Sequence, residues 1–124
     1  MKDQKYVILC VDDDQDTLDM LRIALESGGY KVCEAVTAED GLKKYKSDNP
    51  DLLIVDLMME EVDAGTSFVK ELKALGNKAP IYMLSSVGDA LSDTVDSAEL
   101  GLAGVFQKPV HADSLIWTLK TKLG

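Results

Sequence analysis

Short apolar runs alternate with amphipathic stretches along the chain. Five runs of four to six residues, rich in Val, Ile and Leu, have the length and composition of buried strands: 6–11, 31–36, 51–56, 80–84 and 104–107. Apolar side chains at helical spacing follow the first three runs and the last, at 18–25, 38–45, 68–75 and 115–123. A fifth helix is expected after the fourth run, from about residue 89 to 100.

Capping signals separate these segments. Gly28-Gly29 ends the first helix, Thr37 and Asp40 form a start resembling a capping box, and Asn49-Pro50 ends the second helix. Five strand–helix units in succession predict an α/β fold, a doubly wound parallel sheet with helices on both faces. With right-handed crossovers, the flavodoxin-like order 2-1-3-4-5 is the expected topology, in one domain over residues 1–124 with no output domain.

Composition narrows the class of protein. The chain has 124 residues, 46% of them hydrophobic and 28% charged, as in an ordinary globular domain. It contains no apolar run near the ~20 residues of a membrane span. Residues 1–5 have no apolar signal core behind them, so we expect a cytoplasmic protein without a membrane partner. Cys10 and Cys33 are interpreted as two buried free thiols.

The net charge argues against nucleic acid as a direct partner. The chain has 13 basic and 22 acidic residues, a formal net charge of −9, and therefore lacks a basic footprint. Nine of the acids fall within residues 12–19 and 56–63, which contain no Lys or Arg. The remaining 13 acids balance the 13 basic residues, so the whole charge imbalance lies in these two segments.

Chemically active side chains stand where the expected strands end. The first strand ends in Asp12-Asp13-Asp14, the third in Asp56 and the fourth in Ser85-Ser86, and Lys108 follows the fifth. Because the carboxyl ends of parallel strands meet at one edge, these groups are expected to line a single cleft. A site for a nucleotide or flavin phosphate needs a turn rich in Gly or Ser after the first strand. Here that turn is acidic, which argues against a nucleotide or flavin site.

Converging carboxylates need a cation. At ~4 Å and an effective dielectric constant of ~20, each pair of like charges costs up to about 4 kcal/mol. Mg²⁺, a hard cation that prefers oxygen ligands and retains water, suits such a cluster. The alternative is a solvated helix N-terminus, where the dipole favours acids. Asp14 and Asp16 fit that alternative; for Asp12 and Asp13 the metal site is favoured, because Asp56 and Lys108 share their edge.

An Asp beside Mg²⁺, with a hydroxyl and a lysine opposite, suits phosphoryl transfer onto the carboxylate. The segments VDDD (11–14), LLIVDLMM (52–59), MLSS (83–86) and FQKP (106–109) resemble the four signatures of response-regulator receiver domains. Asp13 and Asp56 are 43 positions apart, Ser85 follows after 29 more and Lys108 after a further 23. The resemblance covers the whole chain and implies the CheY-like version of the flavodoxin-like fold.

The resemblance also implies roles for individual residues. Four groups would hold Mg²⁺: the side chains of Asp12 (through metal-bound water), Asp13 and Asp56 and the backbone carbonyl of Met58. Asp56 would be the phosphoacceptor, while Ser85 and Lys108 would contact the phosphoryl group. The donor would be a phosphohistidine on a sensor histidine kinase or phosphotransfer protein of a two-component system or phosphorelay. The chain would then be a phosphoprotein that helps to catalyse its own phosphorylation, not an enzyme, and would signal by docking on a downstream protein.

The sequence departs from the family at several positions. Most receivers carry Tyr or Phe three residues before the lysine; here Val105 stands there, and Phe106 is expected to face the opposite side of the sheet. Met58 and Val87, two positions beyond Asp56 and Ser85, cannot orient a water molecule, so a long-lived phosphorylated state is predicted. The acidic stretch 60–63 is interpreted as a variable solvated loop or, alternatively, as a determinant of metal affinity or kinase choice.

The sequence leaves alternatives for two side chains and for the function. Trp117 lies about 200° around its helix from the core position Leu115, either along the helix edge or as an anchor on an exposed partner surface. His111 is interpreted as a surface residue.

The alternative functions are a receiver-shaped interaction module that works without phosphorylation and a Mg²⁺-dependent phosphohydrolase. The second fits less well, because the acidic motif differs from the DxDx(T/V) of haloacid dehalogenases and the chain is short.

Overall fold

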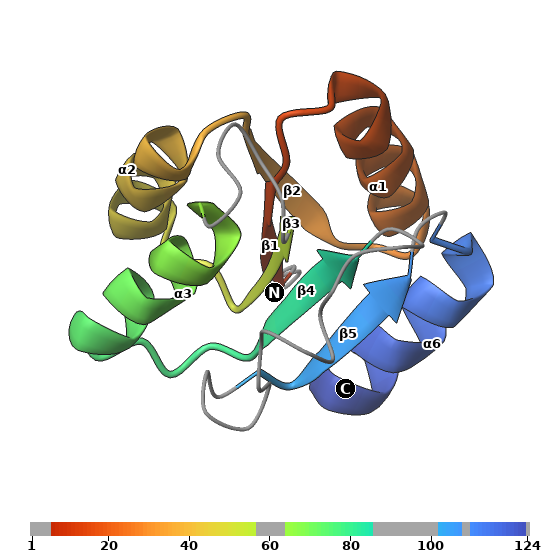
Figure 1. Cartoon of the computed structure of the whole chain (residues 1–124). Coiled ribbons are helices and arrows are strands. Elements are labelled where there is room, and N and C mark those ends of the chain that lie inside the picture. Colours follow the sequence, from red (N-terminus) through yellow and green to blue (C-terminus); the bar gives the residue numbers. More distant parts are fainter. Residues whose placement is uncertain (1–5, 57–63, 86–101, 108–109, 124) are drawn as a thin grey trace.

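The computed structural model describes residues 6–56, 64–85, 102–107 and 110–123 (Figure 1). Its strands are β1 (Val7–Val11), β2 (Lys31–Ala35), β3 (Leu52–Asp56), β4 (Ile81–Ser85) and β5 (Gly104–Gln107). Its helices are α1 (Gln15–Ser27), α2 (Ala38–Asp48), α3 (Ala64–Ala74) and α6 (Ala112–Leu123). The helix expected over 89–100 lies outside the described residues. None of the described helices combines the length and the hydropathy that a membrane span requires.

The strands form one parallel sheet in the order β2-β1-β3-β4-β5, which confirms the predicted topology. All five predicted strands are present, with ends shifted by at most one residue. The central strands β1 and β3 are almost wholly buried, which explains their continuous apolar runs. In register, Val11 pairs with Val55, and Asp56 pairs with Leu84.

Alternate strand side chains build two separate cores. Helices α1 and α6 cover one face of the sheet, where Ile8 and Ile54 pack with Leu21 (Figure 1). Helices α2 and α3 cover the other face, where Val11 and Phe68 meet. Gly41 of α2 permits a close approach there, because an added Cβ would lie 3.1 Å from both Phe68 and Val11.

The capping residues behave as the sequence predicted. The hydroxyl of Thr37 accepts a hydrogen bond from the backbone N–H of Asp40 at 3.0 Å and so caps α2. Asn49 ends α2 in the left-handed conformation at φ 51°. Gly28 caps the end of α1, and Gly29 follows at φ 92°.

Two sequence interpretations need correction. Helical periodicity predicts Leu75 on the apolar face of its helix, but α3 ends at Ala74 and the Leu75 side chain is 50% exposed. Its backbone N–H closes the final turn on the carbonyls of Glu71 and Leu72. Both cysteines are free as expected, but only Cys10 is fully buried; Cys33, on the edge strand β2, is half-buried.

Candidate metal and phosphoacceptor site

Three carboxylates meet at the carboxyl edge of the central strands. Asp56 is the last residue of β3, and Asp12 and Asp13 directly follow β1. Because β1 and β3 are parallel, with Val11 beside Val55, the next residues along the two chains are Asp12 and Asp56. One carboxylate oxygen from each of Asp12, Asp13 and Asp56 lies within 4.8 Å of the others.

Burial differs sharply among these three acids. Asp12 and Asp56 are buried, with exposed fractions of 0% and 4%, whereas Asp13 is exposed. Two buried carboxylates so close together repel each other strongly unless a cation lies between or beside them. An all-oxygen donor set that opens to solvent on one side suits a hard divalent ion that keeps part of its water shell. The residues therefore fit Mg²⁺.

Backbone hydrogen bonds hold the loop that carries Asp12 and Asp13. The N–H of Asp12 donates to the carbonyl of Ala35 at 3.0 Å, which ties the loop to β2. The N–H of Asp14 donates to Asp12 Oδ1 at 2.9 Å and orients that buried carboxylate. Asp14 itself caps α1, accepting from the N–H of Asp16 at 3.1 Å and from the Thr17 hydroxyl at 3.0 Å. Asp14 thus belongs to the helix start, as predicted, and not to the three-carboxylate cluster.

Ser85 ends β4 at the same edge of the sheet. Asp56 pairs with Leu84 in the parallel register, so Ser85 lies one residue beyond the level of Asp56 on the neighbouring strand. The Ser85 side chain is 1% exposed. The structure thus places a buried hydroxyl at the end of the strand next to the one that carries Asp56.

Other predicted site residues lie outside the described part of the chain. These are Met58, Val87, Lys108 and the acidic stretch 60–63. Their assignments remain predictions from the sequence. The described part of the site is therefore the carboxylate cluster with Ser85 on the adjoining strand.

Val105 and Phe106 face opposite sides of β5, as predicted. Phe106 packs in the core beneath α1 and α6, with its ring centroid 5.3 Å from that of Tyr82. Val105 pairs with Met83 and is 36% exposed. Within the described residues, the aromatic side chain of β5 thus lies on the α6 face of the sheet.

Trp117 and His111 are both on the surface. The Trp117 side chain is 71% exposed on α6, an unusually open position for so large an apolar group. The Trp117 side chain is therefore open to solvent, and its role as an anchor on a partner surface stays a prediction. His111, just before α6, is exposed as predicted.

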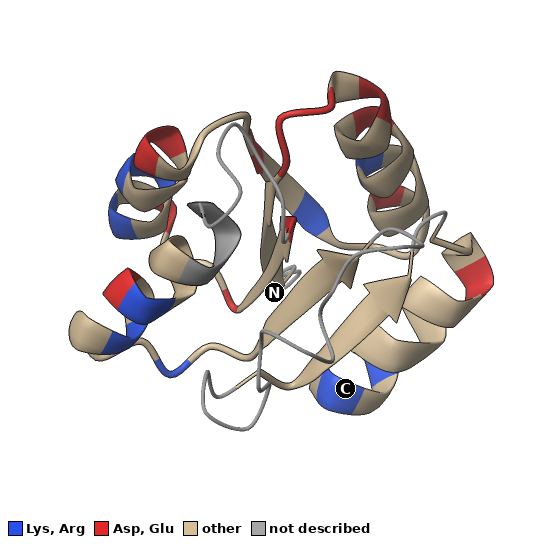
Figure 2. Ribbon diagram, viewed as in Figure 1, with Lys and Arg blue, Asp and Glu red and all other residues tan. Residues whose placement is uncertain are grey.

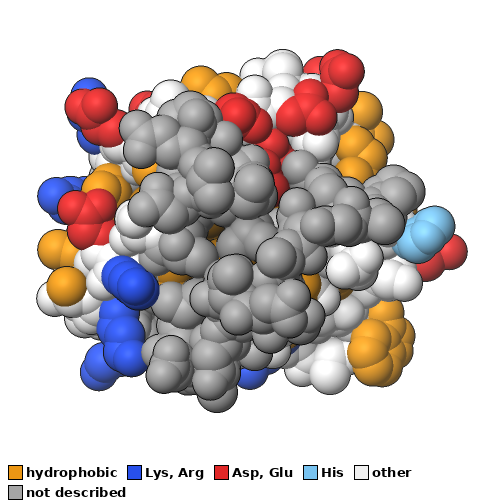
Figure 3. Space-filling model, in the orientation of Figure 1, with side chains coloured by type: hydrophobic (Ala, Val, Ile, Leu, Met, Phe, Trp, Pro, Cys, Tyr) orange, Lys and Arg blue, Asp and Glu red, His pale blue; other side chains and the backbone are white. Residues whose placement is uncertain are grey.

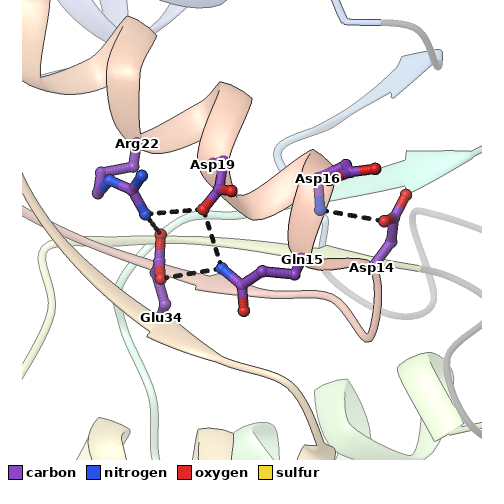
Figure 4. A network of polar contacts seen from close by, with 6 residues as sticks. All are labelled: Asp14, Gln15, Asp16, Asp19, Arg22 and Glu34. Carbon is purple, nitrogen blue, oxygen red and sulfur yellow. Dashed lines mark hydrogen bonds and ion pairs between the residues drawn. The ribbon is translucent and has the colours of Figure 1, made fainter.

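A polar network beside the acidic loop was not foreseen from the sequence (Figure 4). Arg22 Nη1 lies 2.9 Å from Asp19 Oδ1 and 2.8 Å from Glu34 Oε2. The Gln15 amide donates to the same two acids, at 3.0 and 3.5 Å. Hydrogen bonds from Gln15 and Arg22 lower the pKa of Asp19. The i, i+3 spacing of Asp19 and Arg22 was visible in the sequence, but the contact with Glu34 depends on how β2 packs against α1.

Charge is unevenly distributed over the molecule. Acidic residues lie on the loop after β1 and at the start of α1, while lysines lie on α3, on the turn after it and near the end of α6 (Figure 2). The space-filling view shows acidic side chains together along its upper edge and lysines at its lower left (Figure 3). In the described residues, negative charge therefore gathers near the carboxylate cluster.

Comparison with known proteins agrees with this geometry. The family model "Response regulator receiver domain" matches residues 8–120. The alkaline phosphatase synthesis transcriptional regulatory protein PhoP of Bacillus subtilis is 35% identical over 102 residues, which cover 82% of this chain and 42% of that protein. The chain spans about a quarter to a half of the length of the curated relatives it matches.

Solved structures show the same fold. A response regulator receiver domain protein (CheY-like) from Methanospirillum hungatei superposes with a TM-score of 0.86 at 30% identity, covering 97% of this chain and 94% of that one. The chemotaxis response regulator CheY4 of Vibrio cholerae gives a TM-score of 0.84 at 27% identity, covering 97% and 100% of the two chains. The chain therefore belongs to the response regulator receiver domains, the receivers of two-component signalling.

Proposed function

We propose that Asp56 accepts a phosphoryl group from a phosphohistidine of a sensor histidine kinase or phosphotransfer protein, in a Mg²⁺-dependent reaction. The observation that carries this proposal is the convergence of three carboxylate oxygens within 4.8 Å, one of them from Asp56 at the end of a central strand. In an acidic cluster at this edge of a parallel sheet, a carboxylate can act as a nucleophile once its charge is offset.

The chemistry requires a small number of groups. A carboxylate oxygen of Asp56 attacks phosphorus, the P–N bond to the imidazole breaks, and the electron pair leaves with the histidine nitrogen. The product is an acyl phosphate on Asp56. Asp12, Asp13 and Asp56, with the backbone carbonyl of Met58, would hold Mg²⁺, which when bound offsets negative charge on the phosphoryl oxygens. The Ser85 hydroxyl would donate a hydrogen bond to one of those oxygens, and Lys108 would pair with another.

Phosphorylation is proposed to act on a docking surface. A phosphoryl group adds up to about two negative charges at a residue that is 4% exposed on β3, beside β4 and two strands away from β5. That change would bias the arrangement of β5 and its flanking helices, including α6 with its exposed Trp117. The chain would thus be a cytoplasmic phosphoacceptor that signals by binding a downstream protein, rather than an enzyme with turnover of its own.

Intact-mass measurement tests this function. The protein is incubated with acetyl phosphate and MgCl₂, alongside Asp56→Asn as a matched variant that keeps the side-chain size. We expect one phosphoryl adduct on the wild type and none on Asp56→Asn or when EDTA is present. If neither acetyl phosphate nor a panel of histidine kinases produces an adduct, the proposal is wrong, and an interaction module that works without phosphorylation is favoured.

A further inference from the structure

Two successive residues of β2 hold both ends of the loop that carries Asp12 and Asp13. At its start, the N–H of Asp12 donates to the carbonyl of Ala35 at 3.0 Å. At its end, the Gln15 amide lies 3.5 Å from Glu34 Oε1 and 3.0 Å from Asp19 Oδ1. Glu34 and Ala35 are adjacent at the carboxyl end of the edge strand.

The contact with Glu34 is part of a closed ring of four hydrogen bonds (Figure 4). Gln15 and Arg22 are the donors, and Asp19 and Glu34 are the acceptors, each contacting both donors. Glu34 is the member of the ring that comes from another element, since Gln15, Asp19 and Arg22 all belong to α1. The Glu34 side chain is 25% exposed, so solvent competes for it less than for the 44% exposed Asp19. The ring thus fixes the first turns of α1 to the sheet.

Fixing Gln15 restrains Asp13, which lies only two positions earlier. Asp13 is exposed, so in the absence of a tether its carboxylate is free to relieve repulsion from Asp12 and Asp56 by moving into solvent. A loop anchored at both ends limits that movement and keeps three ligand oxygens close together before any cation arrives. Such preorganisation lowers the free-energy cost of assembling the site.

We propose that Glu34 is a positioning residue for the metal site, acting through Gln15 and Arg22 on the loop that carries Asp12 and Asp13. This inference rests on the proposed function, because it assumes that the carboxylate cluster binds Mg²⁺. Glu34 touches neither the cation nor the phosphoryl group in this scheme.

Two substitutions separate positioning from simple charge. Glu34→Asp keeps the negative charge but is one methylene shorter, so it cannot reach both donors. Glu34→Gln removes the charge and keeps the length, but it leaves one acceptor oxygen where Gln15 and Arg22 each use one. If Glu34 positions the loop, Glu34→Asp weakens Mg²⁺ binding by about three- to tenfold, roughly the loss of one or two hydrogen bonds. Glu34→Gln then weakens Mg²⁺ binding as well, because it cannot accept from both donors, whereas a role of charge alone would weaken binding in Glu34→Gln and leave Glu34→Asp at the wild-type affinity.

A matched control removes a hydrogen bond that does not lead to the acidic loop. The hydroxyl of Tyr45 donates to Asn77 Oδ1 at 3.1 Å and links α2 to the turn after α3. Tyr45→Phe is expected to lower stability as much as Glu34→Asp does but to leave Mg²⁺ affinity unchanged. For Glu34→Asp, the phosphorylation rate with acetyl phosphate should also recover at saturating MgCl₂, because excess cation compensates for the looser loop.

Titration calorimetry with MgCl₂ on the wild type, Glu34→Asp, Glu34→Gln and Tyr45→Phe provides the test. Weaker Mg²⁺ binding by Glu34→Asp and Glu34→Gln than by the wild type and Tyr45→Phe is the expected result. Equal affinity for the wild type and Glu34→Asp would overturn the role of Glu34 and leave the proposed function intact. Absence of Mg²⁺ binding by the wild type would overturn both, and the mass measurement above then reports on phosphorylation independently.

Discussion

The backbone N–H of Asp14 donates to Asp12 Oδ1 at 2.9 Å, so the residue that caps α1 also orients a fully buried carboxylate of the site. The start of the helix and the acidic cluster are therefore one structural unit. The bond uses the Asp14 backbone, whereas the cap uses its side chain. The two roles can thus be separated by substitution.

Removing the Asp14 side chain should affect stability rather than chemistry. Asp14→Ala loses the hydrogen bonds to Asp16 and Thr17, and its free energy of unfolding should fall by about 1 kcal/mol. Asp14→Asn retains a capping oxygen and should stay close to the wild type in a urea titration. Equal losses in both variants would show that the charge of Asp14, and not its cap, stabilises the helix.

Removing one carboxylate from the cluster should stabilise the protein when Mg²⁺ is absent. Asp56→Asn eliminates the repulsion between two buried charges, and its free energy of unfolding in EDTA should exceed that of the wild type by about 1–2 kcal/mol. Addition of MgCl₂ at a hundred times its dissociation constant should stabilise the wild type by about 2.7 kcal/mol. Asp56→Asn should gain much less. A variant less stable than the wild type in EDTA would contradict the repulsion argument.

Stability should decline at alkaline pH because of the thiols. Burial raises the pKa of Cys10 far above its ordinary value, and burial together with the Asp48 carboxylate raises that of Cys33 to about 11. Above pH ~8.5 the thiols ionise in the unfolded chain but stay protonated in the folded protein, so the unfolded state is favoured. Each thiol should lower the free energy of unfolding by up to about 1.4 kcal/mol per pH unit above this point. Below that pH the thiols contribute no pH dependence.

Urea titrations in a reducing buffer at pH 8, 9 and 10 (roughly spanning the thiol pKa of an unfolded chain) measure this decline. Cys10→Ala should show a flatter pH profile, because it removes the more deeply buried thiol. If Cys10→Ala declines as steeply as the wild type, another group controls the alkaline loss of stability.

The strands were predictable from the sequence because their environment is simple. Val55 and its neighbours are buried on both faces, so the run 52–55 is continuously apolar and ends where Asp56 reaches the open edge. The predicted helix includes Leu75 because helical periodicity does not show where the last turn closes. The contact of Glu34 with Arg22 could not be predicted, since the two residues are 12 positions apart and lie on different elements.

The site was predictable for a related reason. Asp12, Asp13 and Asp56 are brought together by strand ends alone, and parallel pairing of β1 and β3 is enough to align them. The hydrogen bonds by which Ala35 and Glu34 hold the loop depend on the position of the edge strand and on the length of the side chains, which periodicity does not describe.

The phosphorylated form should be long-lived. Met58 and Val87, two positions beyond Asp56 and Ser85 in the sequence, offer no polar group that could orient an attacking water. After removal of acetyl phosphate, the adduct should decay over minutes or longer, and Met58→Asn should shorten its lifetime. Loss of the wild-type adduct within seconds would contradict the prediction.

Two aromatic residues near the C-terminus should differ in their effect on stability. Phe106→Ala removes a ring that packs on Tyr82 in the core and should lower the free energy of unfolding by about 2 kcal/mol. Trp117→Ala removes a side chain that is 71% exposed and should change it by less than ~0.5 kcal/mol. Trp117→Ala should also accept phosphate from acetyl phosphate at the wild-type rate. A large stability loss would mark Trp117 as structural and not as part of a docking surface.

The central claim is that Asp56 carries the phosphoryl group. Borohydride reduces an aspartyl phosphate to homoserine, which peptide mass spectrometry locates to a single residue. After incubation with acetyl phosphate and MgCl₂, we predict homoserine at position 56 in the wild type and none when EDTA replaces the metal. Homoserine at another position, or none in the presence of Mg²⁺, would contradict the account.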